Sequence, residues 1–165
     1  MKLDPSAFLA DPELIQALEK HAIEVSCGGD NVLFRQGDPP VGLYILNRGE
    51  VTLSMASPAG DPILSMHVGA GSLLGLPGLV GNAPYTLTAV AGQGAELSFL
   101  AHDDFDALMQ SDPRLSLKVL EVLAAEVRSA RIATLELRHE PKSAPRLTLH
   151  HSPCETQAHA ISRKS

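Results

Sequence analysis

The sequence predicts a mainly β domain, an antiparallel roll with one helix before it and two helices after it. Three observations support this class. Short apolar segments separated by Gly, Asn, Asp and Pro fill the middle of the chain. All 13 glycines lie between Gly28 and Gly94, so the tight turns belong to that part. Helical periodicity with a proline at the helix start occurs on either side of it, from Pro12 and from Pro113.

Length, charge and cysteine usage limit the classes of function. The 165 residues, 44% of them hydrophobic, suit one domain with a single core. Residues 1–139 carry 9 − 17 = −8 charges, which repels nucleic acid and anionic lipid. Cys27 and Cys154 lie far apart, which favours free thiols in a reducing compartment. We therefore expect a cytoplasmic protein that neither enters a membrane nor binds DNA directly.

The first helix is expected from Asp11 onward. Asp11, Pro12 and Glu13 have the residue types of an N-cap, a first helical position and an acidic first turn. Apolar residues then recur at helical spacing as far as Ile23, and glycines follow Cys27. The pattern predicts a single helix over this whole segment.

The roll is expected over about residues 28–100, as a double-stranded β-helix or jelly roll. Its predicted strands are Asn31–Arg35, Gly42–Leu46, Gly49–Met55, Ile63–Val68, Thr86–Ala91 and Glu96–Leu100.

Two helices are expected over about residues 103–139. The polar residues His102–Asp104 are candidates to cap a short helix, and Ser111–Pro113 to start a long one. We treat residues 1–139 as one domain. Residues 140–165 are rich in Pro, Ser, Thr and His, and we expect a flexible tail there.

One face of the long helix carries a heptad pattern of apolar residues. With Leu120 at position a and Leu123 at d, it continues through Val127, Ala130, Thr134 and Leu137. This seam would suit a second copy of the chain, giving a homodimer. Alternatively, the first half of the helix covers the roll, and both can hold along one helix.

Four segments carry a resemblance to a known family. They are Val32–Asp38, Leu43–Val51, Gly69–Gly75 and Phe105–Arg128, and together they span most of residues 8–135. They resemble the cyclic nucleotide-binding domains, in particular the sensor domains of bacterial regulators of the catabolite activator and fumarate-nitrate regulator group. The resemblance implies a β-roll with an N-terminal helix, a long C-terminal helix and a regulatory, non-catalytic function.

The resemblance places the family's phosphate-binding cassette at Gly75–Ala91. In relatives, a Glu after the first glycine holds the ribose hydroxyl and an Arg after the proline pairs with the cyclic phosphate. Leu76 and Tyr85 occupy these positions here. Each hydrogen bond to a charged group is worth roughly 1.5–3 kcal/mol, so a micromolar affinity would fall towards millimolar. We expect no binding of cyclic AMP by the usual contacts.

Part of the cassette is retained. Gly75, Gly78 and Leu79 could offer backbone N–H groups to an anion, Pro84 is in place, and Thr86 could donate from its hydroxyl.

Three interpretations of the pocket stay open. It could bind a different, apolar or weakly polar small molecule and signal through the C-terminal helix. It could be filled by its own side chains, leaving a dimerisation or protein-interaction module. It could hold a cyclic nucleotide in another way, through Arg128 or Arg131 of the long helix. Tyr85 could stack on a base or fill the pocket.

We expect no cofactor and no catalysis. The histidines lack the paired spacing of a metal site, and two cysteines are too few for an iron–sulfur cluster. Haem is not expected, and no nucleophile–base motif or Walker loop is present. Regulators of this group continue into a helix-turn-helix domain, which residues 140–165 do not resemble. A stand-alone sensor domain is therefore expected. The alternative is a regulator of the catabolite activator type without its DNA-binding domain, with a native, truncated or frame-shifted tail.

Overall fold

The computed structural model describes residues 1–27 and 31–139, so the expected tail lies outside the described residues. The helical elements are η1 (Pro5–Phe8), α1 (Pro12–Glu19), α2 (Leu76–Gly81), α3 (His102–Ser111) and α4 (Pro113–His139). The strands are β1 (Ile23–Ser26), β2 (Asn31–Phe34), β3 (Gly42–Arg48), β4 (Glu50–Ala56), β5 (Pro62–Gly69), β6 (Leu73–Leu74), β7 (Thr88–Ala91) and β8 (Glu96–Ala101).

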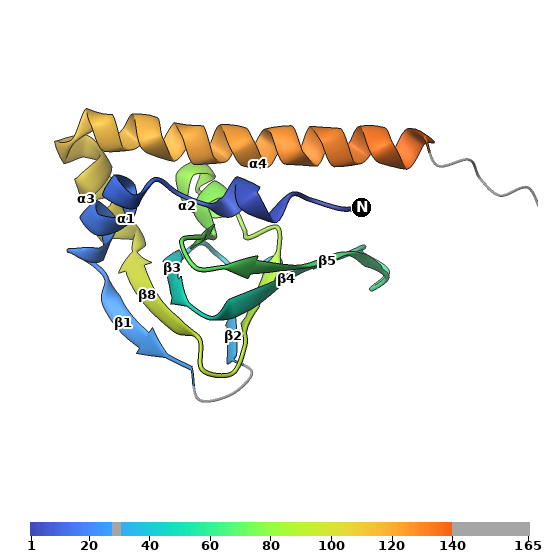
Figure 1. Ribbon diagram of the computed structural model, residues 1–165, viewed down its shortest axis with the longest axis horizontal. Coiled ribbons are helices and arrows are strands. Elements are labelled where there is room, and N and C mark those ends of the chain that lie inside the picture. The colour runs from blue at the N-terminus through green and yellow to red at the C-terminus, as the bar shows by residue number, and fades with distance from the viewer. Residues whose placement is uncertain (28–30, 140–165) are drawn as a thin grey trace, which may run out of the picture.

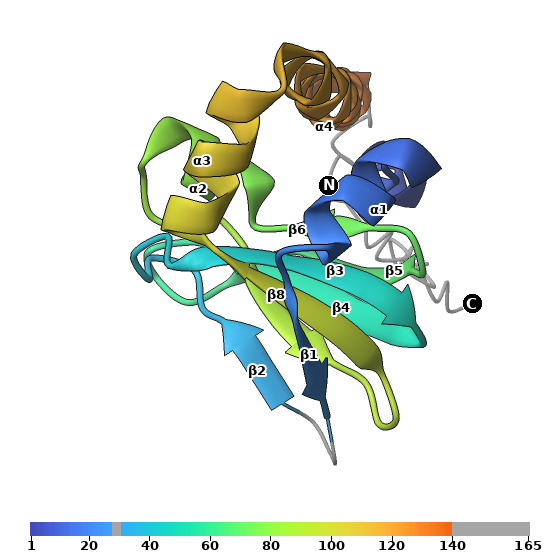
Figure 2. The same ribbon diagram turned by 90° about the vertical axis from the view of Figure 1, so that its left-hand side faces the viewer.

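The strands form the predicted jelly roll. One four-stranded sheet has the order β1-β8-β3-β6 and the other the order β2-β7-β4-β5, with every pairing antiparallel. The helices lie together on one side of this roll, and α4 runs along it (Figures 1 and 2).

Two apolar layers hold the domain together. Successive side chains of a strand point to opposite faces, and β3 shows this directly. Leu46 belongs to a roll-interior layer with residues of both sheets, whereas Leu43 and Ile45 belong to a helix-side layer. Leu14 and Leu18 of α1 are fully buried in the helix-side layer, one helical turn apart.

The first helix is shorter than predicted. Asp11 caps it as expected, accepting a hydrogen bond from the Glu13 N–H at 2.8 Å, but α1 ends at Glu19. Ile23 starts strand β1, which pairs with β8. The helical spacing of Ile23 was therefore misleading, because pairing with a neighbouring strand decided its conformation.

The short helix α3 begins at His102 itself. Its N-cap position is Ala101, with no side-chain cap, so the prediction that His102–Asp104 cap it was wrong. Asp103 and Asp104 lie in the first turn instead, where acidic side chains favour the positive end of the helix dipole.

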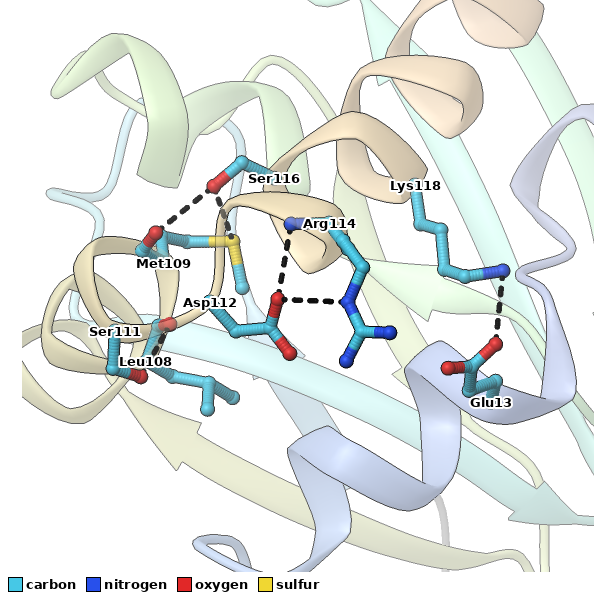
Figure 3. Close-up of polar contacts among 8 residues, drawn as sticks. All are labelled: Glu13, Leu108, Met109, Ser111, Asp112, Arg114, Ser116 and Lys118. Atoms are coloured by element: carbon cyan, nitrogen blue, oxygen red, sulfur yellow. Dashed lines mark hydrogen bonds and ion pairs between the residues drawn. The ribbon is translucent and has the colours of Figure 1, made fainter.

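The start of α4 is fixed by side chains of neighbouring elements (Figure 3). Asp112 Oδ1 accepts a hydrogen bond from the Arg114 N–H at 3.0 Å. Lys118 Nζ lies 3.1 Å from Asp11 Oδ1 and 3.4 Å from Glu13 Oε2, which ties α4 to the start of α1. The hydrogen bond with Lys118 lowers the pKa of Asp11 and raises the pKa of Lys118.

The inner face of α4 follows a second heptad pattern. It consists of Leu115, Val119, Val122, Glu126, Ser129 and Ala133, all of them buried except the half-buried Glu126. The first half of this face packs in the helix-side layer, which confirms that α4 covers the roll. Within the described residues, no helix is long and apolar enough to span a membrane.

Candidate functional site

The cassette segment folds as the end of β6, the short helix α2 and a loop leading to β7. Gly75 stands between β6 and α2 with φ of +91°, in the left-handed region that favours glycine. A Cβ at this position would lie 2.9 Å from Cε1 of Tyr85. Both the turn and the close approach of Tyr85 therefore require glycine here.

Tyr85, at the position where the resemblance places the phosphate-binding arginine, is a buried structural residue. Its side chain is 3% exposed, and its hydroxyl donates to the Gly42 carbonyl oxygen and accepts from the Gly42 N–H at 3.2 Å. Its ring stacks on Phe34, with centroids 4.2 Å apart and planes at 27°. Because its hydroxyl bonds to Gly42 and one face of its ring stacks on Phe34, Tyr85 belongs to the roll-interior layer.

Leu76 and Leu79 point to the other apolar layer. Leu76 is 0% exposed, and both side chains belong to the helix-side layer together with Phe105 of α3. Neither lines the cavity described below. Leu76 therefore contributes to the packing between α2 and the C-terminal helices.

The other retained residues of the cassette are either engaged in packing and hydrogen bonds or exposed at the surface. The Leu79 N–H donates to the Gly75 carbonyl oxygen at 3.1 Å, so it is engaged within α2. Gly78 is buried, and a Cβ there would lie 3.0 Å from both the Ala83 carbonyl oxygen and Cδ1 of Tyr85. Pro84 and Thr86 are exposed.

Two small cavities lie between the cassette and α4. The first has a volume of about 30 Å³ and the second of about 170 Å³. Ligand pockets usually measure roughly 300–1,000 Å³, so this site suits only a compact ligand unless side chains move. Four residues line both cavities: Phe8, Thr86, Leu87 and Glu126.

Glu126 of α4 is the site residue that the sequence analysis missed. Its Oε1 is buried and has no hydrogen-bond partner among the described residues. Burial raises its pKa to about 8, because removal from water disfavours the charged form. Its place in the inner heptad pattern of α4 is the signal that could have revealed it. The heptad pattern identifies Glu126 as a buried residue only once the face of α4 that packs on the roll is known.

Of the predicted seam residues and arginines of α4, Ala130 lines the second cavity and the others line neither cavity. Leu120 and Val127 are 55% and 49% exposed, whereas Leu123 is half-buried against the helix-side layer. Arg128 lines a separate groove between α4 and the N-terminal segment, and Arg131 lines a groove on the outer side of α4. Neither arginine lines the two cavities.

Histidines and acids gather into no metal site in the described part of the chain. The exposed His67 lies on β5 and contacts Thr52 Oγ1 and Glu50 Oε1, each at 3.1 Å. Cys27 is a buried free thiol.

The sequence matches the cyclic nucleotide-binding domain family over residues 24–112, more than half of its 165 residues. The chain belongs to this family. No curated protein matches it.

Solved structures of bacterial regulators share the fold. The catabolite activator protein of Thermus thermophilus is 24% identical, with a TM-score of 0.68, and the match covers 82% of this chain and 63% of that chain. The chain thus spans less than two thirds of that protein. The N-terminal domain of a transcriptional regulator from Streptomyces coelicolor A3(2) is 28% identical, with a TM-score of 0.58 and coverages of 79% and 93%. The c-di-GMP responsive global regulator CLP of Xanthomonas campestris is 19% identical, with a TM-score of 0.67 and coverages of 79% and 66%. The family and these neighbours identify a regulatory sensor domain fold.

Proposed function

We propose that this domain is a cytoplasmic, non-catalytic sensor that binds a small molecule other than cyclic AMP beneath α4 and signals through that helix. The observation that carries the proposal is Tyr85. It takes the place of the phosphate-binding arginine and is bonded to Gly42, while a small cavity remains beside it. The fold of a nucleotide sensor is kept, and its anion contact is replaced.

The coupling from cassette to α4 is a continuous apolar layer. Leu76 and Leu79 of α2, Phe105 of α3 and Leu115 of α4 belong to this one layer. Packed layers shift between discrete arrangements rather than deform gradually. A ligand that displaces α2 would therefore displace α3 and change the tilt of α4 about its first turns.

The output in this proposal is a homodimer formed by the outer face of α4. Leu120 and Val127 are exposed there at the heptad spacing of a coiled coil, on the side of the helix away from the roll. Spin labels at Glu121→Cys, with Cys154→Ser to remove a second labelling site, would report the distance across the dimer. A distance that stays fixed with every ligand that binds would exclude the switch.

Calorimetry with cyclic AMP and cyclic GMP tests the ligand class directly. Dissociation constants weaker than about 1 mM are expected, because the contacts of a guanidinium and a carboxylate are both absent. Tight, stoichiometric binding of either nucleotide would refute the proposal. A thermal-shift screen with small metabolites would then search for the ligand, since a molecule that binds only the folded form raises the Tm.

A second candidate function is a ligand-free dimerisation module. The small volume of the cavity beside Tyr85, about 30 Å³, favours it. This candidate predicts that no compound of the screen raises the Tm, while the dimer persists.

A further inference from the structure

The inner face of α4 contains one group that packing does not explain. At position 126 the chain places a carboxyl among apolar and small residues, and its Oε1 receives no hydrogen bond from the described residues. Buried polar groups are almost always hydrogen-bonded, since an unpaired one destabilises the folded state. An apolar residue would pack here with no such penalty. Groups of this kind are tolerated where function uses them.

The lining of the cavities does not suit an anion. Their lining residues include no Lys or Arg, and Glu126 is the one acid. Tyr85, the other titratable residue of the lining, already exchanges two hydrogen bonds with Gly42. No side chain of this lining donates a hydrogen bond to Glu126 Oε1, so a ligand that brings a donor would satisfy it, whereas a phosphate would meet a carboxyl instead of a guanidinium.

We propose that the carboxyl of Glu126 is the recognition group of this site, and that the ligand is a compact molecule presenting N–H donors, such as an amine, amidine or amino-substituted heterocycle without phosphate. This inference rests on the proposed sensor function. The ligand is at most about the size of one ring system, because the two cavities measure about 30 and 170 Å³.

The position of Glu126 also connects the site to the signalling helix. Ser129 lies one turn further along α4 and accepts a hydrogen bond at 2.7 Å from the Asp4 N–H of the N-terminal segment. Phe8 of η1 lines both cavities. A ligand bonded to Glu126 would thus lie against both α4 and η1.

The experiment measures Tm and calorimetric affinity of the full chain with benzamidine and benzylamine, and with benzoate as the anion of similar shape. It is run at pH 8.5, where Glu126, whose pKa burial raises to about 8, is largely ionised. The variants are Glu126→Leu and Glu126→Gln. Glu121→Gln is the matched control, because Glu121 is an exposed glutamate on the same helix.

Benzamidine or benzylamine should raise the Tm of the unchanged chain and of Glu121→Gln, whereas benzoate should not. Both Glu126 variants should lose at least tenfold in affinity for the amidine or amine. Glu126→Gln keeps the size of the side chain, so it serves if Glu126→Leu fails to fold. Unchanged affinity in a folded Glu126 variant, an equal response to benzoate, or no response to either cation would overturn the inference.

The metabolite screen separates this inference from the sensor function. If a compound without N–H donors raises the Tm while the cations do not, the chain is a sensor and the role of Glu126 is refuted. If nothing in either set binds, both proposals fall and the ligand-free module stands.

Discussion

Tyr85 illustrates how a single side chain can change what a pocket accepts. A tyrosine cannot ion-pair with phosphate, and here its hydroxyl satisfies both backbone polar groups of Gly42. Its ring contributes to the roll-interior layer through Phe34. If Tyr85 stands at the arginine position, as the resemblance implies, it exchanges an anion contact for a buried structural one.

Removal of the Tyr85 hydroxyl should destabilise the domain. Tyr85→Phe leaves the N–H and carbonyl of Gly42 without this partner in a buried place, so a loss of about 1–3 kcal/mol is expected. Tyr44→Phe is the matched control, because the Tyr44 hydroxyl makes one long hydrogen bond, of 3.3 Å to the Leu33 carbonyl, and the residue is only half-buried. Urea unfolding measures both. Equal losses of unfolding free energy in the two variants would show that the contacts with Gly42 add no stability beyond that of an ordinary tyrosine hydroxyl.

Helix α4 is the element through which the proposed sensor would signal. Its inner heptad pattern covers the roll, whereas Leu120, Val127 and Leu137 of its outer pattern are exposed. Lys118 and Asp112 fix its first turns to neighbouring elements, so movement is expected to pivot about this end. A long helix held at one end can turn a small displacement near the cassette into a larger one along the rest of its length.

The dimer prediction is tested by placing a charge on each side of α4. Val127→Glu should dissociate the dimer, because it buries a carboxylate in the outer seam. Ile132→Glu should not, since Ile132 lies at the opposite, f position of that heptad. The two side chains are equally exposed in the single chain, at 49% and 51%. Sedimentation velocity gives the oligomeric state, and dissociation by both variants or by neither would refute the seam.

For the whole molecule, Glu126 makes the free energy of unfolding depend on pH. The pKa of Glu126 is about 8 in the folded chain, against an ordinary value of 4.5. Between these values the unfolded chain gives up the proton and the folded chain keeps it. The free energy of unfolding therefore falls as pH rises, by no more than about 1.4 kcal/mol per pH unit.

Glu126→Gln should remove this part of the pH dependence. Urea unfolding at pH 5, 6 and 7 measures it, and the difference between the two chains cancels titration of the histidines. Asp4 and Asp11 have lowered pKa values, through hydrogen bonds from Ser6 and Lys118 respectively, so their stabilising effect is lost only at pH below their ordinary value of 3.8. Parallel pH curves for the two chains would show that Glu126 titrates normally.

The sequence alone determined the class of fold, the starts of α1 and α4, and the presence of Leu76 and Tyr85 in the cassette segment. These features depend on local turn chemistry, helix caps and residue identity, which neighbouring residues specify. The end of α1 escaped prediction, because pairing with β8 overrides the local pattern around Ile23.

Tertiary structure decided what those residues do. Leu76 could face a ligand or the helices, Tyr85 could meet a base or a backbone, and α4 has two apolar patterns of similar period. Only the packing shows that Leu76 joins the helix-side layer, that Tyr85 forms hydrogen bonds with Gly42, and that Oε1 of Glu126 is buried. Periodicity tells which residues share a face of a helix, but contacts between residues far apart in the chain decide which face is buried.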